Sequence, residues 1–143
     1  MIITDNHMHI YNHLRFRALE EFKKAGGTHV FLVSLLSKCY NVTIKTGDEF
    51  RKVFEEHIKI VKKANKIVRA YAVLSVHPAE ITILGGRYGF KKAAEIMKRG
   101  LEIAGEFVKE GEAVAIKSGR PHYKVSKEVW KLSNEVMLYA VSY

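Results

Sequence analysis

The chain has 143 residues and a formal net charge of +9, with 48% hydrophobic and 27% charged residues. This length suits one domain with a hydrophobic core, and the balance of hydrophobic and charged residues excludes disordered and fibrous proteins. The longest apolar runs fall far short of the roughly 20 residues that a membrane span needs, and the first residues do not resemble a secretory signal. We therefore expect one globular domain over residues 1–143, located in the cytoplasm and not in a membrane.

The positive charge makes polyanions such as nucleic acid or a phosphate ester candidate partners, because lysine and arginine release counterions when they neutralise phosphates. The lysines are mixed with glutamates along the expected helices, however, and such charges are usually only solvated faces. The single cysteine, Cys39, cannot form an internal disulfide. Abundant lysine and glutamate without any glutamine follow the composition trend of hyperthermophile proteins.

The first expected strand covers residues 2–9 and contains the run Asp5-Asn6-His7-Met8-His9. Side chains alternate along a strand, so Asp5, His7 and His9 are predicted to share one face. Two imidazoles that converge in this way suit a divalent metal. Two ligands do not make a site, and the alternative is a polar strand end whose histidines only hydrogen-bond to neighbours.

Strand patterns and amphipathic helical patterns alternate through the rest of the chain. Asn12 is the expected N-cap of the first helix, and Thr46 with Glu49 forms a capping box for the second. Strict alternation favours right-handed βαβ units and a parallel sheet, hence an α/β fold. The further strands are expected at 28–34, 68–76 and 113–116, and the helices at 12–25, 46–65, 90–110 and from 126 onward.

Candidate functional residues follow the expected strands, where α/β proteins build their sites. His77-Pro78 ends the third strand. The glycine-rich run 83–89 is expected to be a loop in which Arg87 approaches an anion, although an ordinary glycine-rich turn explains it equally well. The long connection 35–45 is a candidate for lining a site, whereas His57 falls on the buried stripe of its helix and is expected to be a packed residue.

Three motifs resemble the TatD-related branch of the metal-dependent amidohydrolase superfamily, particularly its archaeal members. The resemblance covers essentially the whole chain and implies a (β/α)8 TIM-type barrel, of which this chain resembles the first half, with four parallel strands. It also implies one or two divalent metals, such as zinc, manganese or magnesium, that activate water to hydrolyse a phosphodiester or related bond. Several members are deoxyribonucleases. The motifs are Asp5-Asn6-His7-Met8-His9, Val76-His77-Pro78, and Gly119-Arg120-Pro121-His122-Tyr123 followed by Ser126-Lys127-Glu128-Val129-Trp130.

The resemblance implies that His7 and His9 are metal ligands and that His77 and Arg120 line the substrate pocket. Together with the residues above, the candidate site has Asp5 and His77 as catalytic groups and Arg87, Arg120 and His122 as substrate-binding groups. Family members carry a metal-bridging glutamate on the fourth strand, where this chain has Lys117. Lys117 is either a carbamylated bridge between metals or a cation that disfavours metal binding by like-charge repulsion, in which case no metal is bound.

The resemblance also places further ligands on later strands that this chain does not reach. A four-stranded half-barrel exposes two strand edges and an apolar inner face. We therefore expect a homodimer or higher homo-oligomer, with two halves closing one barrel and the partner's His7 and the partner's His9 adding ligands. Three functions follow: a TatD-like hydrolase, impaired by the missing acid; a non-catalytic truncated paralogue that acts as a binding or assembly module; and a basic nucleic-acid-binding protein without chemistry.

Overall fold

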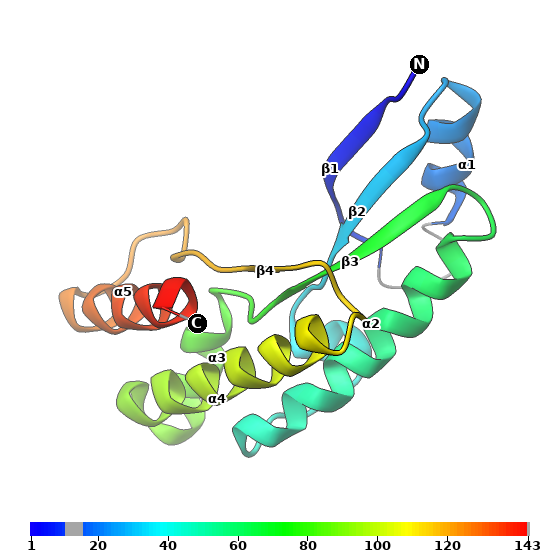
Figure 1. The fold of residues 1–143 in the computed structure, drawn as a ribbon. Coiled ribbons are helices and arrows are strands. Elements are labelled where there is room, and N and C mark those ends of the chain that lie inside the picture. The colour runs from blue at the N-terminus through cyan, green and yellow to red at the C-terminus, as the bar shows by residue number, and fades with distance from the viewer. Residues whose placement is uncertain (11–15, 143) are drawn as a thin grey trace.

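A computed structural model describes residues 1–10 and 16–142 as an α/β structure (Figure 1). Four parallel strands form one sheet in the order β1-β2-β3-β4. The strands are Thr4–Met8 (β1), His29–Val33 (β2), Arg69–Ser75 (β3) and Ala115–Lys117 (β4). The α-helices are Phe16–Lys24 (α1), Phe50–Ala64 (α2), Glu80–Tyr88 (α3), Phe90–Lys109 (α4) and Lys127–Ser142 (α5), and short 3-10 helices cover Ser37–Tyr40 (η2) and Gly47–Glu49 (η3). The predicted half-barrel of alternating βα units is confirmed.

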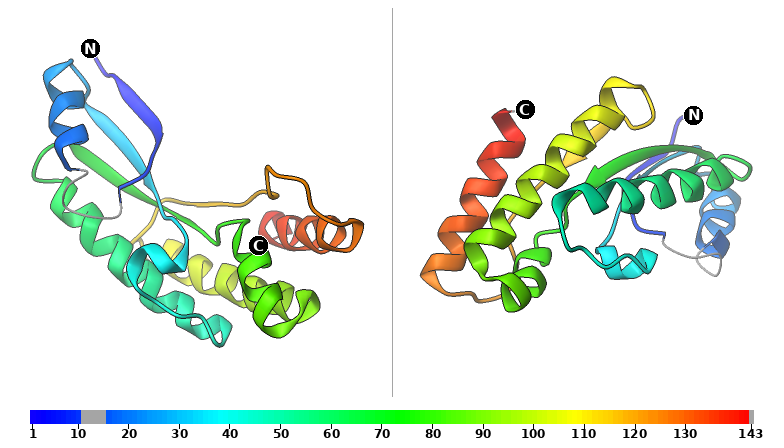
Figure 2. Two further views of the ribbon diagram at one scale, coloured as in Figure 1. Left: turned by 180° about the vertical axis from the view of Figure 1, so that it is seen from behind. Right: turned by 90° about the horizontal axis from the view of Figure 1, so that it is seen from below.

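The helices cover one face of the sheet only. Figure 2 shows α1, α2 and α4 on the same side of the strands, and α5 beside α4. No helix in the described ranges covers the other face, on which the rings of Phe31 and Tyr71 stack with centroids 5.2 Å apart. β1 and β4 form the two edges of the sheet. The fold therefore has the open inner face and the free edges of half a barrel.

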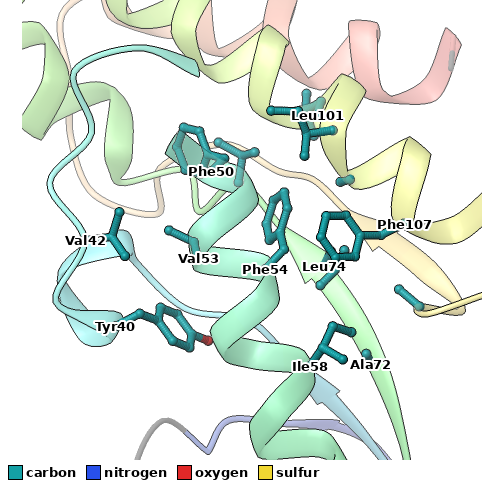
Figure 3. Close-up of a cluster of buried hydrophobic side chains, with 14 of the residues drawn as sticks. Tyr40, Val42, Phe50, Val53, Phe54, Ile58, Ala72, Leu74, Leu101 and Phe107 are labelled. Atoms are coloured by element: carbon teal, nitrogen blue, oxygen red, sulfur yellow. The ribbon is translucent and has the colours of Figure 1, made fainter. Parts of the chain in front are cut away.

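The core lies between the sheet and the helices α2 and α4 (Figure 3). Phe54 on α2 meets Phe107 on α4 edge to face, with ring centroids 5.9 Å apart. Gly100 lets the two helices and the sheet approach closely, because a Cβ there would lie 2.6 Å from Cδ2 of Phe50. None of the helices in the described part of the chain is long and apolar enough to cross a membrane.

The first strand departs from the predicted alternation. Asp5 is level with Val30 and Met8 is level with Leu32, so two residues of β1 stand opposite one residue of β2. This bulge shifts the face on which later side chains lie. Met8 packs against the core, and the histidines on either side of it lie on the open face. The prediction that Asp5 shares their face was wrong.

The glycine-rich run 83–89 is not the predicted loop, because Glu80–Tyr88 is the helix α3. Ile81 and Leu84 are buried, and burial of these side chains offsets the cost of glycine in a helix, about 1 kcal/mol each. Gly89 then ends α3 with a φ of 86°, in the region that favours glycine.

Two further boundaries differ from the prediction. β4 runs from Ala115 to Lys117 and not from 113 to 116, so Lys117 belongs to the strand and is level with Ser75 of β3. The predicted N-cap at Asn12 lies outside the described residues, and α1 is described from Phe16 onward.

Candidate functional site

Three strands bring nitrogen-bearing side chains together at their carboxyl ends. His7 lies near the end of β1, His9 directly after it, His77 two residues beyond the end of β3, and Lys117 at the end of β4. The Nε2 atoms of His7 and His9 are 3.0 Å apart, and Nζ of Lys117 is 3.3 Å from Nε2 of His7. The two imidazole rings meet edge to face with centroids 4.7 Å apart. We call His7, His9, His77 and Lys117 the nitrogen cluster.

His9 is oriented by the neighbouring strand. Its Nδ1 lies 2.9 Å from the carbonyl oxygen of Val33, and since a carbonyl only accepts, Nδ1 carries a proton and donates it. In the neutral ring the lone pair is then on Nε2, directed at His7. This is how a ring is held when Nε2 serves as a ligand.

Nε2 of His7 cannot form hydrogen bonds to both His9 and Lys117 at the same time. If its Nε2 donates to the lone pair of His9, it cannot also accept a proton from Lys117. Burial is the main reason why the pKa of His7 is lowered, and the nearby Lys117 and then His9 lower it further. Asp5 raises it. The neutral ring is therefore favoured, and the ammonium of Lys117 gains an acceptor from His7 only when the His7–His9 hydrogen bond is given up.

His77 is half-buried and follows β3 after Val76, and its tautomer is defined by one contact. The backbone N–H of Ala79 donates to Nδ1 of His77 over 3.1 Å, so the proton of the neutral ring is on Nε2. Burial lowers the pKa of His77, and the nearby Lys117, His9 and His122 lower it further. A neutral His77 therefore offers an N–H donor beside the ammonium of Lys117.

Asp5 holds the backbone of the bulge. One carboxylate oxygen, Oδ1, accepts a hydrogen bond of 3.0 Å from the backbone N–H of His7. Such a contact two residues along the chain stabilises a local turn. Asp5 therefore positions the residue that bears the first imidazole.

The three predicted substrate-binding residues lie in different places. Arg87, on α3, lines a pocket of about 360 Å³ with residues of the 35–45 connection. Arg120 lies with its guanidinium carbon 4.5 Å from the ring centroid of Trp130, and its Nη1 donates to Oδ1 of Asn134 over 3.2 Å. Only His122, which contacts the ring of Tyr123 at a centroid distance of 5.7 Å, is close enough to lower the pKa of His77.

A catalytic zinc normally has three protein ligands and a water. In the ranges 1–10 and 16–142, no group of three or more His, Cys, Asp or Glu side chains is placed to hold a metal ion. His7 and His9 supply two imidazole nitrogens, and the third group beside them is an ammonium, which repels a divalent cation. The donor set of the described residues therefore does not fit a catalytic metal.

Comparison with known proteins identifies the family. The model of the family described as TatD related DNase matches residues 4–143. The chain belongs to the TatD-related DNase family. It is also 29% identical over 144 residues to the "Uncharacterized protein MJ1127" of Methanocaldococcus jannaschii. That alignment covers 97% of this chain and 49% of the relative, so the TatD-related chain spans about half the length of the curated relative that it matches. No solved structure matches the chain.

One buried carboxylate near the site escaped the sequence analysis. Glu80 is 1% exposed, and its Oε1 accepts a hydrogen bond of 2.6 Å from the backbone N–H of Ser37. Its position three residues after His77, in an otherwise apolar helix start, is the signal that would have drawn attention to it. Glu80 ties the connection after β2 to the beginning of α3.

Proposed function

We propose that this chain binds a phosphodiester of nucleic acid at the nitrogen cluster, as a TatD-type hydrolase whose metal-ligand set is incomplete within one chain. Hydrolysis by the single chain is accordingly weak or absent. The observation that carries the proposal is the contact of Lys117 with His7, since an ammonium stands beside the two imidazoles that the family would use for a metal. The family match supports DNA as the source of the phosphodiester.

An anionic oxygen relieves the conflict within the cluster. It supplies Lys117 with the acceptor that a His7 ring hydrogen-bonded to His9 cannot supply. Nε2–H of His77 donates to a second oxygen of the same phosphate. Hydrogen bonds from a charged donor to phosphate are about twice as strong as neutral ones. Asp5 acts as a positioning residue through the backbone of His7, and not on the substrate.

A second candidate function, a metal-dependent hydrolase, requires a further chain. It is favoured by the convergence of Nε2 of His7 and Nε2 of His9 and by the hydrogen bond that orients His9. We propose that β1 of one copy pairs with β4 of another, which closes the two open edges and brings further ligands to the cluster. A homo-oligomer of this kind would hold zinc, manganese or magnesium between copies. Carbamylation of Lys117 also stays a prediction, and a carbon dioxide adduct in native mass spectrometry would reveal it.

One experiment separates these functions. Binding of a labelled DNA oligonucleotide, its cleavage and the metal content are measured for the wild type, for Lys117→Ala and for the His7→Ala, His9→Ala double variant. The control is His29→Ala, a histidine at the opposite end of the sheet. We expect binding that weakens steeply with salt, is indifferent to chelators and is reduced most in Lys117→Ala, which removes a proposed phosphate contact.

The other results have equally defined meanings. Stoichiometric metal that the double variant loses, with cleavage by the wild type, would replace the proposal with the assembled hydrolase. Light scattering would then show a dimer or larger species. Equal DNA binding by the wild type, Lys117→Ala and His29→Ala would overturn the assignment of the phosphate site to the nitrogen cluster.

A further inference from the structure

We propose that a pocket between Tyr123 and Trp130 is a second nucleic-acid subsite, which stacks an unpaired base while neighbouring cations hold the flanking phosphates. This inference rests on the proposed function for its ligand, and it assigns that ligand a second place of contact. The pocket measures about 310 Å³ and lies where the chain passes from the β4 loop into α5. It is lined by Tyr123, Lys124, Val125, Ser126, Lys127 and Trp130.

Two aromatic side chains are exposed in this pocket. Tyr123 is 38% exposed and Trp130, the single tryptophan of the sequence, is 42% exposed. Both belong to a chain that buries Phe50, Phe54 and Phe107 in its core. Base stacking on exposed aromatic rings is the usual way in which proteins hold unpaired nucleotides, because every base has a π-face.

Both rings are held in place before any ligand binds. The hydroxyl of Tyr123 is hydrogen-bonded to Oγ1 of Thr82 on α3. One face of Trp130 is covered by the guanidinium of Arg120, which is itself fixed by its hydrogen bond to Asn134. Side chains that are already ordered lose little entropy on binding. The two rings therefore form a prepared stacking platform.

The charge around the pocket fits a polyanion. Of the six lining residues, two are lysines, Lys124 and Lys127, and none is acidic. Arg120 adds a third cation at Trp130. By contrast, the pocket of about 350 Å³ between α4 and α5 is lined by lysines and glutamates together. Alternating aromatic and basic groups form the usual electrostatic path for a single strand.

The pocket is continuous with the nitrogen cluster along the chain. Lys117 ends β4, and the same segment passes through Arg120 and His122 before it reaches Tyr123. His122 is near enough to His77 to affect its protonation. The segment that joins the pocket to the cluster thus carries two cations, Arg120 and Lys117, which suit the phosphates of a strand bound in the pocket.

The test uses the single tryptophan as the reporter. Titration of the wild type with a single-stranded oligothymidine is expected to quench the fluorescence of Trp130 to saturation, whereas inorganic phosphate leaves it unchanged. The His7→Ala, His9→Ala variant keeps this quenching, which separates failure of the pocket from failure of the cluster. Absence of quenching at saturating oligonucleotide would overturn the proposal.

Removal of each aromatic ring measures how much stacking contributes to the affinity for a single strand. Tyr123→Ala and Trp130→Leu are each expected to weaken binding of a labelled single strand about 5- to 100-fold in fluorescence anisotropy, the range found for one stacked base. A fully paired duplex should bind the variants and the wild type within about twofold. The matched control is Tyr88→Ala, an exposed tyrosine on α3, which should leave single-strand binding unchanged.

Conservative variants separate the loss of stacking from the loss of folding. Tyr123→Phe and Trp130→Phe keep a ring at each position, and circular dichroism checks that all variants fold. Retention of binding by the phenylalanine variants with loss in the aliphatic ones supports stacking. Equal binding by all of them would overturn it. Because stacking alone treats RNA and DNA alike, single strands of both should bind with similar affinity.

Discussion

Histidines occur in two contrasting environments in this molecule. His57, on α2, is completely buried, its Nε2 donates to the carbonyl oxygen of Leu32 over 2.8 Å, and its Nδ1 accepts from the hydroxyl of Tyr40 over 3.1 Å. In the nitrogen cluster, His7 faces two groups with one nitrogen. The buried histidine has as many partners as it has polar atoms, and the cluster has fewer acceptors than donors.

This difference indicates which histidine holds the fold together and which lies in a set of polar atoms that is not fully paired. A buried polar group is tolerated when each polar atom is paired, and it then fixes a unique arrangement. His57 joins η2, α2 and β2 through Tyr40 and Leu32 in this way. An unbalanced set of donors at the surface is instead completed by water or by an anion.

The largest expected effect concerns His57 and the pH dependence of stability. Burial lowers the pKa of His57 from 6.5 to about 4, so the unfolded chain binds its proton more readily. The stability that the folded protein gains from burying neutral His57 is fully present above pH 6.5 and is lost as the pH falls towards 4. The free energy of unfolding should fall by roughly 3 kcal/mol over this range, at 1.36 kcal/mol per pKa unit.

Urea unfolding between pH 4 and 7.5 measures this loss. The variant His57→Gln should be less stable at pH 7 but should show a smaller fall with pH. Lys52→Gln, at an exposed position on the same helix, is the control and should keep the wild-type slope. An unchanged slope in His57→Gln would mean that the acid sensitivity arises in the nitrogen cluster.

The next effect concerns the number of side chains in the nitrogen cluster that can bind a metal ion. Lys117→Glu replaces the ammonium beside His7 with a carboxylate and completes a set of three donors. Zinc affinity, measured by isothermal titration calorimetry, should rise at least about tenfold, a gain of roughly 1.4 kcal/mol. Lys52→Glu, an exposed change of the same charge on α2, should not raise it. Equal gains in both variants would show that only net charge matters.

The smallest effect concerns Glu80, whose Oε1 has a partner while its Oε2 is buried without a hydrogen bond among the described residues. Burial raises the pKa of this carboxyl. The contribution of Glu80 to the stability of the fold is therefore complete below pH 4.5, and it is lost as the pH rises through the pKa that Glu80 has in the folded protein. Glu80→Gln should therefore stabilise the protein at pH 7, by no more than about 1 kcal/mol.

Thermal unfolding at pH 7 and at pH 4 tests this sign. The difference between Glu80→Gln and the wild type should shrink at the lower pH, where the carboxyl is protonated. Glu95→Gln, at an exposed position on α4, should have no such effect. A loss of stability in Glu80→Gln at pH 7 would show that the charge on Glu80 is needed for its contact with Ser37.

The sequence predicted the sheet and most helices because those elements follow from side-chain period. The apolar run at 28–34 and the stripe of α2 need only local information. Ser126 was also predicted correctly as a cap, since its Oγ accepts from the backbone N–H of Val129 over 3.2 Å. The helix α3 was missed because its two glycines outweighed Ile81 and Leu84, whose burial depends on tertiary packing.

The details of the site could not be predicted, because they depend on register. The bulge in β1 removes Asp5 from the face of His7 and His9, and nothing in the alternation of residues reveals a bulge. The contact of Lys117 with His7 joins the two edge strands of the sheet, and no sequence pattern reports how closely these strands approach each other. The composition of the cluster was therefore predictable, whereas the contacts within it were not.

The order of the strands has a consequence for synthesis. Each strand pairs with the strand that precedes it in the sequence, so the sheet grows from β1 to β4 in the order in which the ribosome releases the chain. β2 can pair with β1 before β3 has been translated, and no strand must wait for a distant partner. Chains that fold as they emerge do so from the N-terminus. In this chain, His7 and His9 are made before Lys117, which joins them only when the fourth strand is added.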